Sequence, residues 1–391
     1  MIEPLSIYGA VAVSRIGLQV VTSSLERKRT VPQSTYPKAT LIVAVFNEPL
    51  DVFIRAMSSL MHVDYPDLEV IIVDDGSSNA SDIKRITERA GFIYLHQANA
   101  GKREAMYYGL AKARPESKAI LFSDSDTVWK KDAAKQLVDT LYADNRTGAV
   151  TGEVAVLNHN YSVMTRLIGM RYHMAFAYER ASQSYFKTVT CISGPLGAYK
   201  RHVIESIKDD FISQTFMGKP CTYGDDRHLT NLVLIKGYQV RYAAKAKCYT
   251  QAPTKFFALL KQQSRWGKSY WREILWQIKA LPQHGLYLWY DLIVTSILPF
   301  LLIGSVIYHL VLAALGQPET LVALAITIGL MSFIRVLDPM IRKRDLWYMA
   351  FVLYAFIYFL VLLPVKVLAL FTMTTGRWGS RAMAPEVVVA K

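Results

Sequence analysis

The sequence Ala119-Ile-Leu-Phe-Ser-Asp-Ser-Asp-Thr127 is a short apolar run that ends abruptly in two aspartates. Such a run is typical of a buried parallel strand whose carboxyl end delivers polar side chains into a crevice. Because one serine separates them on extended backbone, Asp124 and Asp126 can address one hard cation and the diphosphate that it neutralises. A lone pair at this spacing is also common in solvated loops and at helix starts. Its meaning therefore depends on the rest of the chain.

Strands and helices alternate around this stretch. Strands are predicted over residues 40–46, 68–73 and 92–96, and helices over about 50–62, 80–90 and 103–113. Each strand ends in polar residues, which predicts a doubly wound α/β sheet with its site at the carboxyl edge. Neither G-x-G-x-x-G nor G-x-x-x-x-G-K-[ST] occurs, which argues against dinucleotide oxidoreductases and P-loop enzymes.

The composition combines a globular domain with membrane segments. The 391 residues are 52% hydrophobic and 19% charged, and the apolar runs concentrate in residues 286–375. A net charge of +14 could indicate nucleic acid, but beside membrane spans it favours a cytosolic domain pressed on an anionic leaflet. The three cysteines are widely spaced, so they predict neither a disulfide framework nor a zinc site and fit a reducing compartment.

The expected membrane segments lie at both ends of the chain. Residues 7–21 are apolar but interrupted by Arg15, so they form either one marginal span or a helix lying in the interface, and not a signal peptide. Residues 288–315 and 321–337 are long enough to cross and return. Residues 346–375 are apolar but interrupted by Pro364 and Lys366.

Two segments of the middle region carry further polar signals. Gly224-Asp225-Asp226 places two acids at a predicted helix start, and the amphipathic helix that follows contains Gln262, Arg265 and Trp266. Each signal alone has a plain explanation: the acids could cap the helix, and Arg265 with Trp266 could be an interfacial anchor. Together with Asp74-Asp75 and Asp124-x-Asp126, ahead of a membrane bundle, they indicate one site.

These residues resemble the processive family 2 glycosyltransferases, and hyaluronan synthases in particular. The similar motifs cover residues 191–196, 214–220, 224–231, 262–270 and 378–381. Chitooligosaccharide synthases of the nodulation type share residues 179–184 and 218–220 and are the alternative. Residues 193–199 and the glycine of Trp378-Gly-Ser-Arg381 favour hyaluronan. The chain departs from the family in having at most one amino-terminal span and in having Ser380 where threonine is usual.

The resemblance implies an organisation and a fold. Residues 1–30 are expected to form the amino-terminal helix, 38–250 a GT-A-like glycosyltransferase domain, 251–285 interfacial helices, 286–376 the membrane bundle and 377–391 a cytosolic tail. The implied localisation is a multi-pass cell-membrane protein with a cytoplasmic catalytic domain. The implied partners are UDP-sugars (UDP-GlcNAc and UDP-GlcA), the growing polysaccharide and membrane lipids, without nucleic acid. The resemblance gives Trp378 a role on the cytosolic side. Residues 346–375 are therefore expected to fold as a hairpin or re-entrant pair broken at Pro364; the alternative is that one of the predicted spans does not cross.

The resemblance and the chemistry of the residues imply the same roles. Mg²⁺ or Mn²⁺ would bind Asp126 and Asp124 and offset the diphosphate charge. Asp226, beside Asp225, is expected to be the general base that takes the proton of the attacking acceptor hydroxyl. Arg265 suits the diphosphate, and Trp266, near Gln262, offers a face for the acceptor sugar. The other expected nucleotide-sugar contacts are Phe46, Glu48, Asp74, Asp75, Lys102, Trp378 and Arg381, and the other acceptor contacts are Ser193, Gly194, Pro195 and Leu196.

Two further hypotheses keep the fold but change the function. One is a non-catalytic transporter or sugar-nucleotide sensor that retains a degenerate transferase domain. The presence of Asp126, Asp226, Arg265 and Trp266 argues against it. The other is a non-processive transferase onto a lipid carrier, which the Gln262-x-x-Arg265-Trp266 pattern and the multiple spans disfavour.

Overall fold

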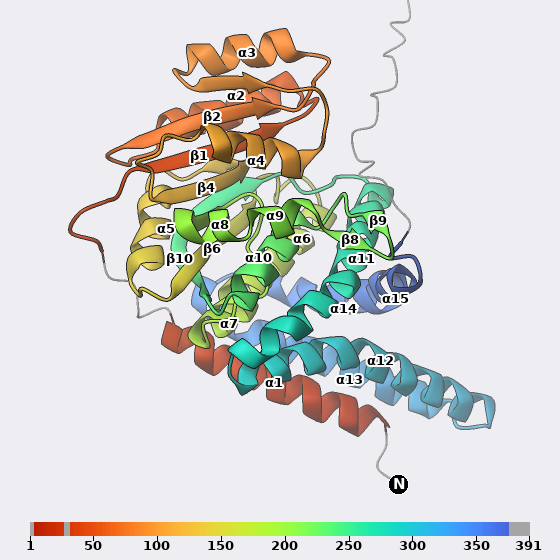
Figure 1. Ribbon diagram of the computed structural model, residues 1–391. Coiled ribbons are helices and arrows are strands. Elements are labelled where there is room, and N and C mark those ends of the chain that lie inside the picture. Colours follow the sequence, from red (N-terminus) through yellow and green to blue (C-terminus); the bar gives the residue numbers. More distant parts are fainter. Residues whose placement is uncertain (1–3, 27–31, 375–391) are drawn as a thin grey trace, which may run out of the picture.

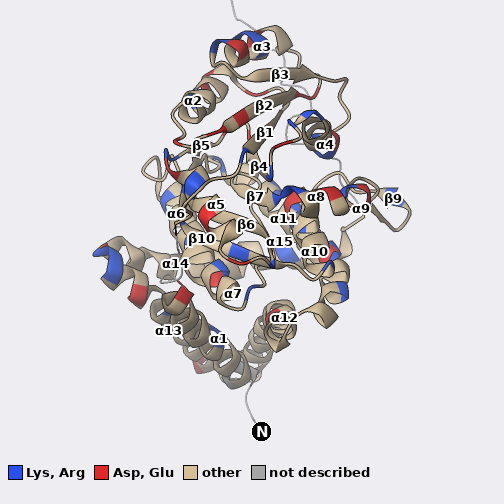
Figure 2. Cartoon of the chain, turned by 60° about the vertical axis from the view of Figure 1, so that its left-hand side comes forward, with Lys and Arg blue, Asp and Glu red and all other residues tan. Residues whose placement is uncertain are grey.

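The computed structural model describes residues 4–26 and 32–374, and Trp378 and Arg381 lie outside the described residues. An α/β domain forms one part of the molecule. The long helices α1 (Pro4–Glu26), α12 (Leu286–Ala314) and α13 (Glu319–Lys343) lie together on one side of it (Figure 1). Figure 2 shows few charged residues along α12, whereas the charged residues of α13 concentrate in its last turns, as is common where a long apolar helix ends.

The domain is built on an eight-stranded sheet with the order β3-β2-β1-β4-β7-β6-β10-β5. The strands are β1 (Ala39–Val45), β2 (Leu68–Asp74), β3 (Ile93–His96), β4 (Ala119–Asp124), β5 (Val128–Trp129), β6 (Thr147–Val156), β7 (Gly197–Lys200) and β10 (Gln239–Thr250). The strands β8 (Thr215–Phe216) and β9 (Lys219–Pro220) form a separate small hairpin. The three predicted strands lie within one or two residues of β1, β2 and β3.

The sheet is mixed rather than fully parallel. Strands β3, β2, β1 and β4 pair in parallel, as the alternating pattern predicts, and β6 pairs in parallel with β10. Strand β7 lies between β4 and β6 and is antiparallel to both. The α/β class is therefore confirmed, and the carboxyl ends of β1, β2 and β4 meet at one edge.

Helices cover both faces of this sheet. The helices of this part of the chain are α2 (Leu50–Met61), α3 (Ala80–Arg89), α4 (Lys102–Lys112), α5 (Ala133–Tyr142), α6 (Val163–Met174), α7 (Ala181–Tyr185), α8 (Arg201–Ser206), α9 (Lys208–Ile212), α10 (Asp225–Ile235) and α11 (Phe256–Ala280), of which α9 and α11 pack on other helices. Helix α4 packs closely on β1 through Gly109, where a Cβ atom would lie 2.5 Å from Ile42 Cγ2. This close packing fixes the start of α4 beside the carboxyl edge of the sheet.

Among the described residues, three helical segments are long and apolar enough to cross a membrane: 286–314, 319–343 and 346–371. Helix α1 is not one of them. Its Arg15 is matched by Asp291 of α12, with 3.0 Å between Nη1 and Oδ1. This pairing lets a charged residue lie inside an otherwise apolar helix contact.

Residues 346–371 follow one continuous helical path, so the pair predicted to break at Pro364 is wrong. A 3₁₀ turn (Leu346–Ala350) leads into α14 (Phe351–Ile357), a π-helical turn (Tyr358–Leu362) and α15 (Leu363–Phe371). Pro364 lies in the first turn of α15, where its missing N–H leaves no hydrogen bond unmade. The π turn before it absorbs the irregularity without a reversal of the chain.

Both ends of this path nevertheless contact the α/β domain. Near its start, the Arg166 guanidinium lies 4.2 Å from the ring centroid of Trp347. Just past its end, the Tyr223 hydroxyl donates a hydrogen bond of 3.1 Å to the Met373 carbonyl oxygen. The described chain therefore ends beside the domain, which is the side that the expected role of the tail requires.

Candidate active site

A cavity of about 590 Å³ joins the carboxyl edge of the sheet to the helices of the membrane side. Its wall includes Phe46 and Asp75 from the sheet edge, Trp266 from α11, and Tyr358 and Lys366 from the last helical segment. A volume of this size is ordinary for a small-molecule site. The cavity thus connects the predicted nucleotide end to the predicted membrane bundle.

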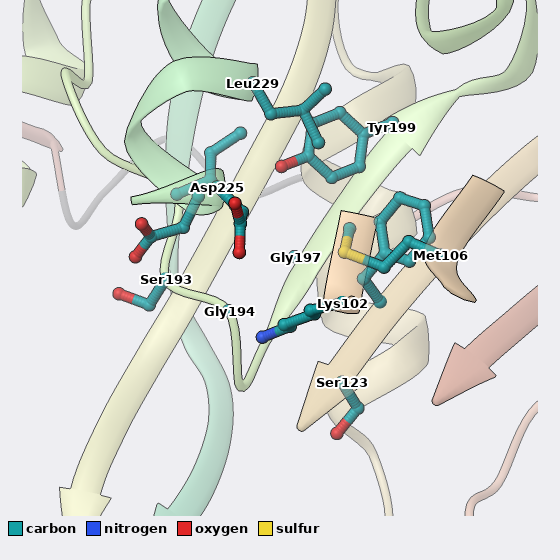
Figure 3. Close-up of a pocket in the computed structure, with 12 residues that line it drawn as sticks. Lys102, Met106, Ser123, Ser193, Gly194, Gly197, Tyr199, Asp225 and Leu229 are labelled. Carbon is teal, nitrogen blue, oxygen red and sulfur yellow. The ribbon is translucent and has the colours of Figure 1, made fainter. Parts of the chain in front are cut away.

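Asp124 lies at the cavity wall and is held by a lysine. Lys102, at the start of α4, forms an ion pair with Asp124. Burial would lower the pKa of Lys102, but the carboxylates of Asp124 and Asp225 raise it, so the amine stays charged. Gly194 faces this pair, since a Cβ there would lie 3.2 Å from both Asp124 carboxylate oxygens. Figure 3 shows the Lys102 amine pointing toward Gly194, with Asp225 on the far side of the same small pocket.

Asp126 lines the same cavity, two residues beyond Asp124. Its Oδ2 is 3.4 Å from the Thr250 hydroxyl of β10. The described residues contain no group of three or more His, Cys, Asp or Glu side chains placed to hold a metal. Two carboxylates open to a cavity are hard oxygen ligands of the kind Mg²⁺ and Mn²⁺ accept, with the remaining positions left to a phosphate-bearing ligand. The residues present therefore fit a divalent cation shared with a diphosphate.

The two acids at the end of β2 are used mainly to shape loops. Asp75 accepts hydrogen bonds from the backbone N–H groups of Ala100 and Gly101, at 2.9 and 2.8 Å, and also lines the cavity. Asp74 is fully buried and accepts from Ser77 N and the Tyr94 hydroxyl. Asp75 is thus in reach of a ligand, while Asp74 lies outside the cavity lining and supports the turn.

The residues after β1 divide in the same way. Phe46 lines the cavity. Glu48 is 2% exposed, lies outside the lining and accepts a hydrogen bond from the Ser125 hydroxyl, between the two acids of the β4 end. Glu48 therefore supports the residue between the two predicted metal ligands without lining the cavity itself.

Asp225 and Asp226 start α10 and both line the cavity. Asp225 is buried against Arg103 in an ion pair. Asp226 lies beside Cys191, with 3.7 Å between Sγ and Oδ2. Burial and the Asp226 carboxylate raise the pKa of the Cys191 thiol, so it stays neutral and can donate to that carboxylate. The preceding Gly224 has φ +84°, and a Cβ there would lie 2.1 Å from Ser269 Oγ, so only glycine fits this turn.

The three residues predicted on one face of α11 all line the cavity. Gln262 Oε1 is buried without a hydrogen-bond partner among the described residues, which leaves it available to a ligand. Trp266 is 42% exposed, and its ring centroid lies 6.4 Å from that of Tyr172. Arg265 completes this face.

The predicted acceptor loop is only partly exposed to the cavity. Ser193, Gly194 and Pro195 line it. Leu196 is fully buried and lies outside the lining, and its Cδ2 would be 2.2 Å from a Cβ placed on Gly152 of β6. Leu196 is therefore a packing residue that anchors the loop.

The cavity also contains residues that sequence reasoning did not assign to it. Tyr354, Tyr358 and Lys366 come from the last helical segment, and Glu179 comes from the π-helical turn Ala175–Arg180. Lys366 lies over the Tyr270 ring, 4.3 Å from its centroid, and has no acidic partner within 4.0 Å among the described residues. A lysine inside an apolar run is itself a functional signal. Its position in a cavity could not be read from the sequence.

Charge is segregated along the cavity. The sheet-edge end carries the carboxylates of Asp75, Asp124, Asp126, Asp225 and Asp226 with the amine of Lys102. At the helical end, the helices away from the sheet edge contribute Arg171, Arg180, Arg265 and Lys366 with the carboxylate of Glu179, while Arg227 follows Asp226 on α10. One end therefore suits a cation, and the other suits an anionic ligand.

Comparisons with known proteins agree with this site. Residues 37–269 match the family model "Glycosyltransferase like family 2". The chain is 31% identical to human hyaluronan synthase 3 over 98% of its own length and 78% of that protein. It is 30% identical to human hyaluronan synthase 2 over 98% of its length and 77% of that protein. A mannosyltransferase of Pyrobaculum calidifontis, solved with GDP-Man and Mn²⁺, covers 92% of this chain and 99% of its own with a TM-score of 0.61 and 20% identity, and so supports the fold.

The fold and the site thus define a glycosyltransferase with a GT-A-like domain and apolar helices that could span a membrane. The chain belongs to the family 2 glycosyltransferases and is hyaluronan synthase-like.

Proposed function

We propose that this protein polymerises UDP-GlcNAc and UDP-GlcA into hyaluronan and passes the chain through its own membrane helices. The carrying observation is the single cavity that runs from the five carboxylates of the sheet edge to Tyr354, Tyr358 and Lys366 of the last helical segment. A site that only transferred one sugar would need no opening into these helices.

The chemistry follows from the acidic end. Asp226 takes the proton of the acceptor hydroxyl while the hydroxyl oxygen attacks the anomeric carbon, and the bond to the UDP oxygen breaks. A divalent cation on Asp126 and Asp124 would offset the charge of the departing diphosphate. Because one displacement occurs and no enzyme nucleophile takes part, the configuration at the anomeric carbon inverts.

The α11 face positions the two substrates. Arg265 has the forked donors that bind a diphosphate through two hydrogen bonds. Trp266 presents its exposed ring for stacking with the acceptor sugar. The unpartnered Gln262 Oε1 can accept a hydrogen bond from a sugar hydroxyl beside it. Holding the acceptor in this way supplies the orientation that the displacement needs.

The charge of the helical end favours a uronate-containing chain. Arg171 is already paired with Glu179, but Arg180 and Lys366 form no ion pair within 4.0 Å among the described residues, so a neutral chitooligosaccharide would leave these two charges unmatched. A chain with one carboxylate per disaccharide offsets these cations as it passes. In this proposal the domain lies on the cytoplasmic side, where nucleotide sugars are made, and the chain leaves across the membrane.

UDP release by the detergent-purified protein tests the proposal. The reaction is run with Mn²⁺ or Mg²⁺ and UDP-GlcNAc alone, UDP-GlcA alone, or both. Sustained turnover only with both sugars, into a polymer that hyaluronidase digests, is the expected result. Chain growth on UDP-GlcNAc alone would instead identify a chitooligosaccharide synthase. Absence of UDP release with every UDP-sugar would favour a non-catalytic protein.

A further inference from the structure

Two consecutive basic residues at the start of α4, Lys102 and Arg103, form ion pairs with aspartates from two different parts of the site. Lys102 pairs with Asp124 of the predicted metal site, and Arg103 pairs with Asp225 beside the predicted base. Arg103 is only 7% exposed. Lys102 lines the cavity, whereas Arg103 has had no part in the site, although a buried arginine must be fully matched to be tolerated.

Arg103 uses all three of its nitrogens. Its Nε donates to Asp225 Oδ1, its Nη1 to the Phe211 carbonyl oxygen at 3.1 Å, and its Nη2 to Gln214 Oε1 at 2.8 Å. A lysine could satisfy only part of this set, since a guanidinium fork holds several acceptors in fixed directions. The start of α4, the acid loop (residues 223–226, which lead into α10) and the loop after α9 are thereby held in one geometry.

The network continues into α11 through a buried glutamate. Gln214 Nε2 donates to Glu273 Oε1 at 2.7 Å, and Glu273 is fully buried. The second oxygen, Oε2, lies 3.0 Å from His228 Nδ1 of α10. Glu273 lies on the helix that also carries Gln262, Arg265 and Trp266, so the network connects that helix to Asp225.

A second branch returns to the acid loop and reaches the carboxyl-terminal segment. Arg272 Nε lies 3.3 Å from Glu273 Oε1, and its Nη2 donates to the Tyr223 carbonyl oxygen. The Tyr223 hydroxyl donates to the Met373 carbonyl oxygen. Tyr223 directly precedes Gly224, whose left-handed backbone leaves the loop one well-defined course.

We propose that Arg103 and Glu273 are positioning residues for the base. Their buried network sets the acid loop, and so Asp226, at a fixed place relative to the Trp266 helix and the segment after α15. The inference rests on the proposed role of Asp226. A displacement of about 1 Å at a reacting group lowers the rate by roughly 10²-fold, so the network is expected to act on kcat while UDP-sugar binding is kept.

The test measures kcat and KM for UDP release in Arg103→Lys, Glu273→Gln and the double variant of the full-length protein. Arg241→Lys is the matched control, because Arg241 forms a similarly buried ion pair with Glu26 and lies outside the cavity lining. Arg103→Lys is expected to lower kcat by roughly 10²-fold, with KM within about twofold and a thermal transition like that of the control. The double variant should lose little more kcat than the worse single variant, because both changes interrupt one network.

Three results would overturn the proposal. In the first, Arg103→Lys lowers kcat no more than Arg241→Lys does. In the second, it raises KM at unchanged kcat. In the third, the fold-loss in kcat of the double variant equals the product of the two single losses, as for independent sites. If Glu273→Gln fails to fold, Gln214→Met takes its place, because Gln214 joins Arg103 to Glu273 and its replacement changes no charge. The single and double variants are then compared in the same way. The assay uses whichever UDP-sugar the wild type consumes, so a product other than hyaluronan would contradict the proposed function and leave this test in place.

Discussion

The two ends of the cavity are built on opposite principles. At the sheet edge, carboxylates from three separate chain segments gather around Lys102. At the helical end, Arg171 and Arg335 pair with Glu179, and Lys366 and several aromatic rings line the same cavity. The first arrangement attracts a cation and a proton, while the second attracts an anion and the faces of sugars.

This difference separates catalysis from chain handling. Changes at the acidic end should stop the chemical step with either sugar. Apart from Arg265, which is proposed to bind the diphosphate, changes at the cationic and aromatic end should alter which chain is held and how far it grows, with smaller losses in UDP release. Helix α11 serves both functions, because Arg265 is proposed to bind the diphosphate and Trp266 the acceptor sugar.

The largest effect is expected from Asp226→Asn. Loss of the general base should lower kcat for UDP release by about 10²–10⁴-fold, while KM changes little. Asp209→Asn, at an exposed helix start away from the cavity, is the control and should keep wild-type activity. A loss of less than tenfold in Asp226→Asn would remove Asp226 from this role.

Metal removal should come next. EDTA is expected to abolish UDP release, and Mn²⁺ or Mg²⁺ should restore it, because the diphosphate charge is then offset again. Asp126→Asn should raise the metal concentration needed for half-maximal activity by at least about tenfold, which is only ~1.4 kcal/mol of binding. Full activity in EDTA would contradict the metal site.

Glu179 tests the cationic end through stability. Burial would raise its pKa, but Arg171, Arg335 and Arg15 lower it to about 2, from an ordinary 4.5. The ion pairs therefore stabilise the fold above about pH 4.5, and this stabilisation is lost as the pH falls toward 2. Glu179→Gln should lower the free energy of unfolding by about 3–5 kcal/mol at pH 7, since it leaves the arginines unmatched. Thermal unfolding should show this difference shrinking between pH 5 and pH 2, and a constant difference would rule out the ion pairs as its cause.

Trp266→Ala should cost about tenfold in polymer formation, in line with the 0.5–1.5 kcal/mol of an aromatic contact. Trp266→Phe keeps a ring and should recover most of the loss. Polymer mass and UDP release are measured together, because a lost stacking contact should shorten chains more than it slows UDP release. Equal losses in both would place Trp266 in the chemical step.

Lys366→Gln should have the smallest effect on turnover. A partly screened charge contact is worth about 1 kcal/mol, so polymer yield at limiting UDP-GlcA should fall about fivefold. Lys261→Gln, an exposed lysine of α11 outside the cavity lining, is the control. An equal loss in both variants would mean that Lys366 does not hold the chain.

Much of the acidic end could be predicted from sequence because it follows local rules. An apolar run indicates a buried parallel strand, and the polar residues that follow it mark the carboxyl end. This pattern predicts Asp75, Asp124 and Asp126 at one edge of the sheet. The 3.6-residue period of α11 likewise predicted one face for Gln262, Arg265 and Trp266. Local patterns do not reveal which side chains turn away, so Asp74 and Leu196 were predicted as contacts although both lie outside the cavity lining.

The helical end depended on contacts between distant segments. Pro364 suggested a break, but the π turn before it lets the helix continue, and such a turn has no sequence signature. Strand β7 lies between β4 and β6 in the sheet and is antiparallel to both. The sequence does not predict this, because a strand of only four residues carries no signal of its direction. The network of Arg103 and Glu273 joins residues 170 positions apart along the chain, which periodicity cannot show.

The central claim is that one cavity joins synthesis to chain passage, and reconstitution tests it most directly. Proteoliposomes with the catalytic domain facing outward are given external UDP-GlcNAc, UDP-GlcA and Mn²⁺, followed by external hyaluronidase. The account predicts that the polymer survives digestion until detergent opens the vesicles, because the chain has entered the lumen. Polymer that is digested without detergent, or a short product that stays with the lipid, would contradict it.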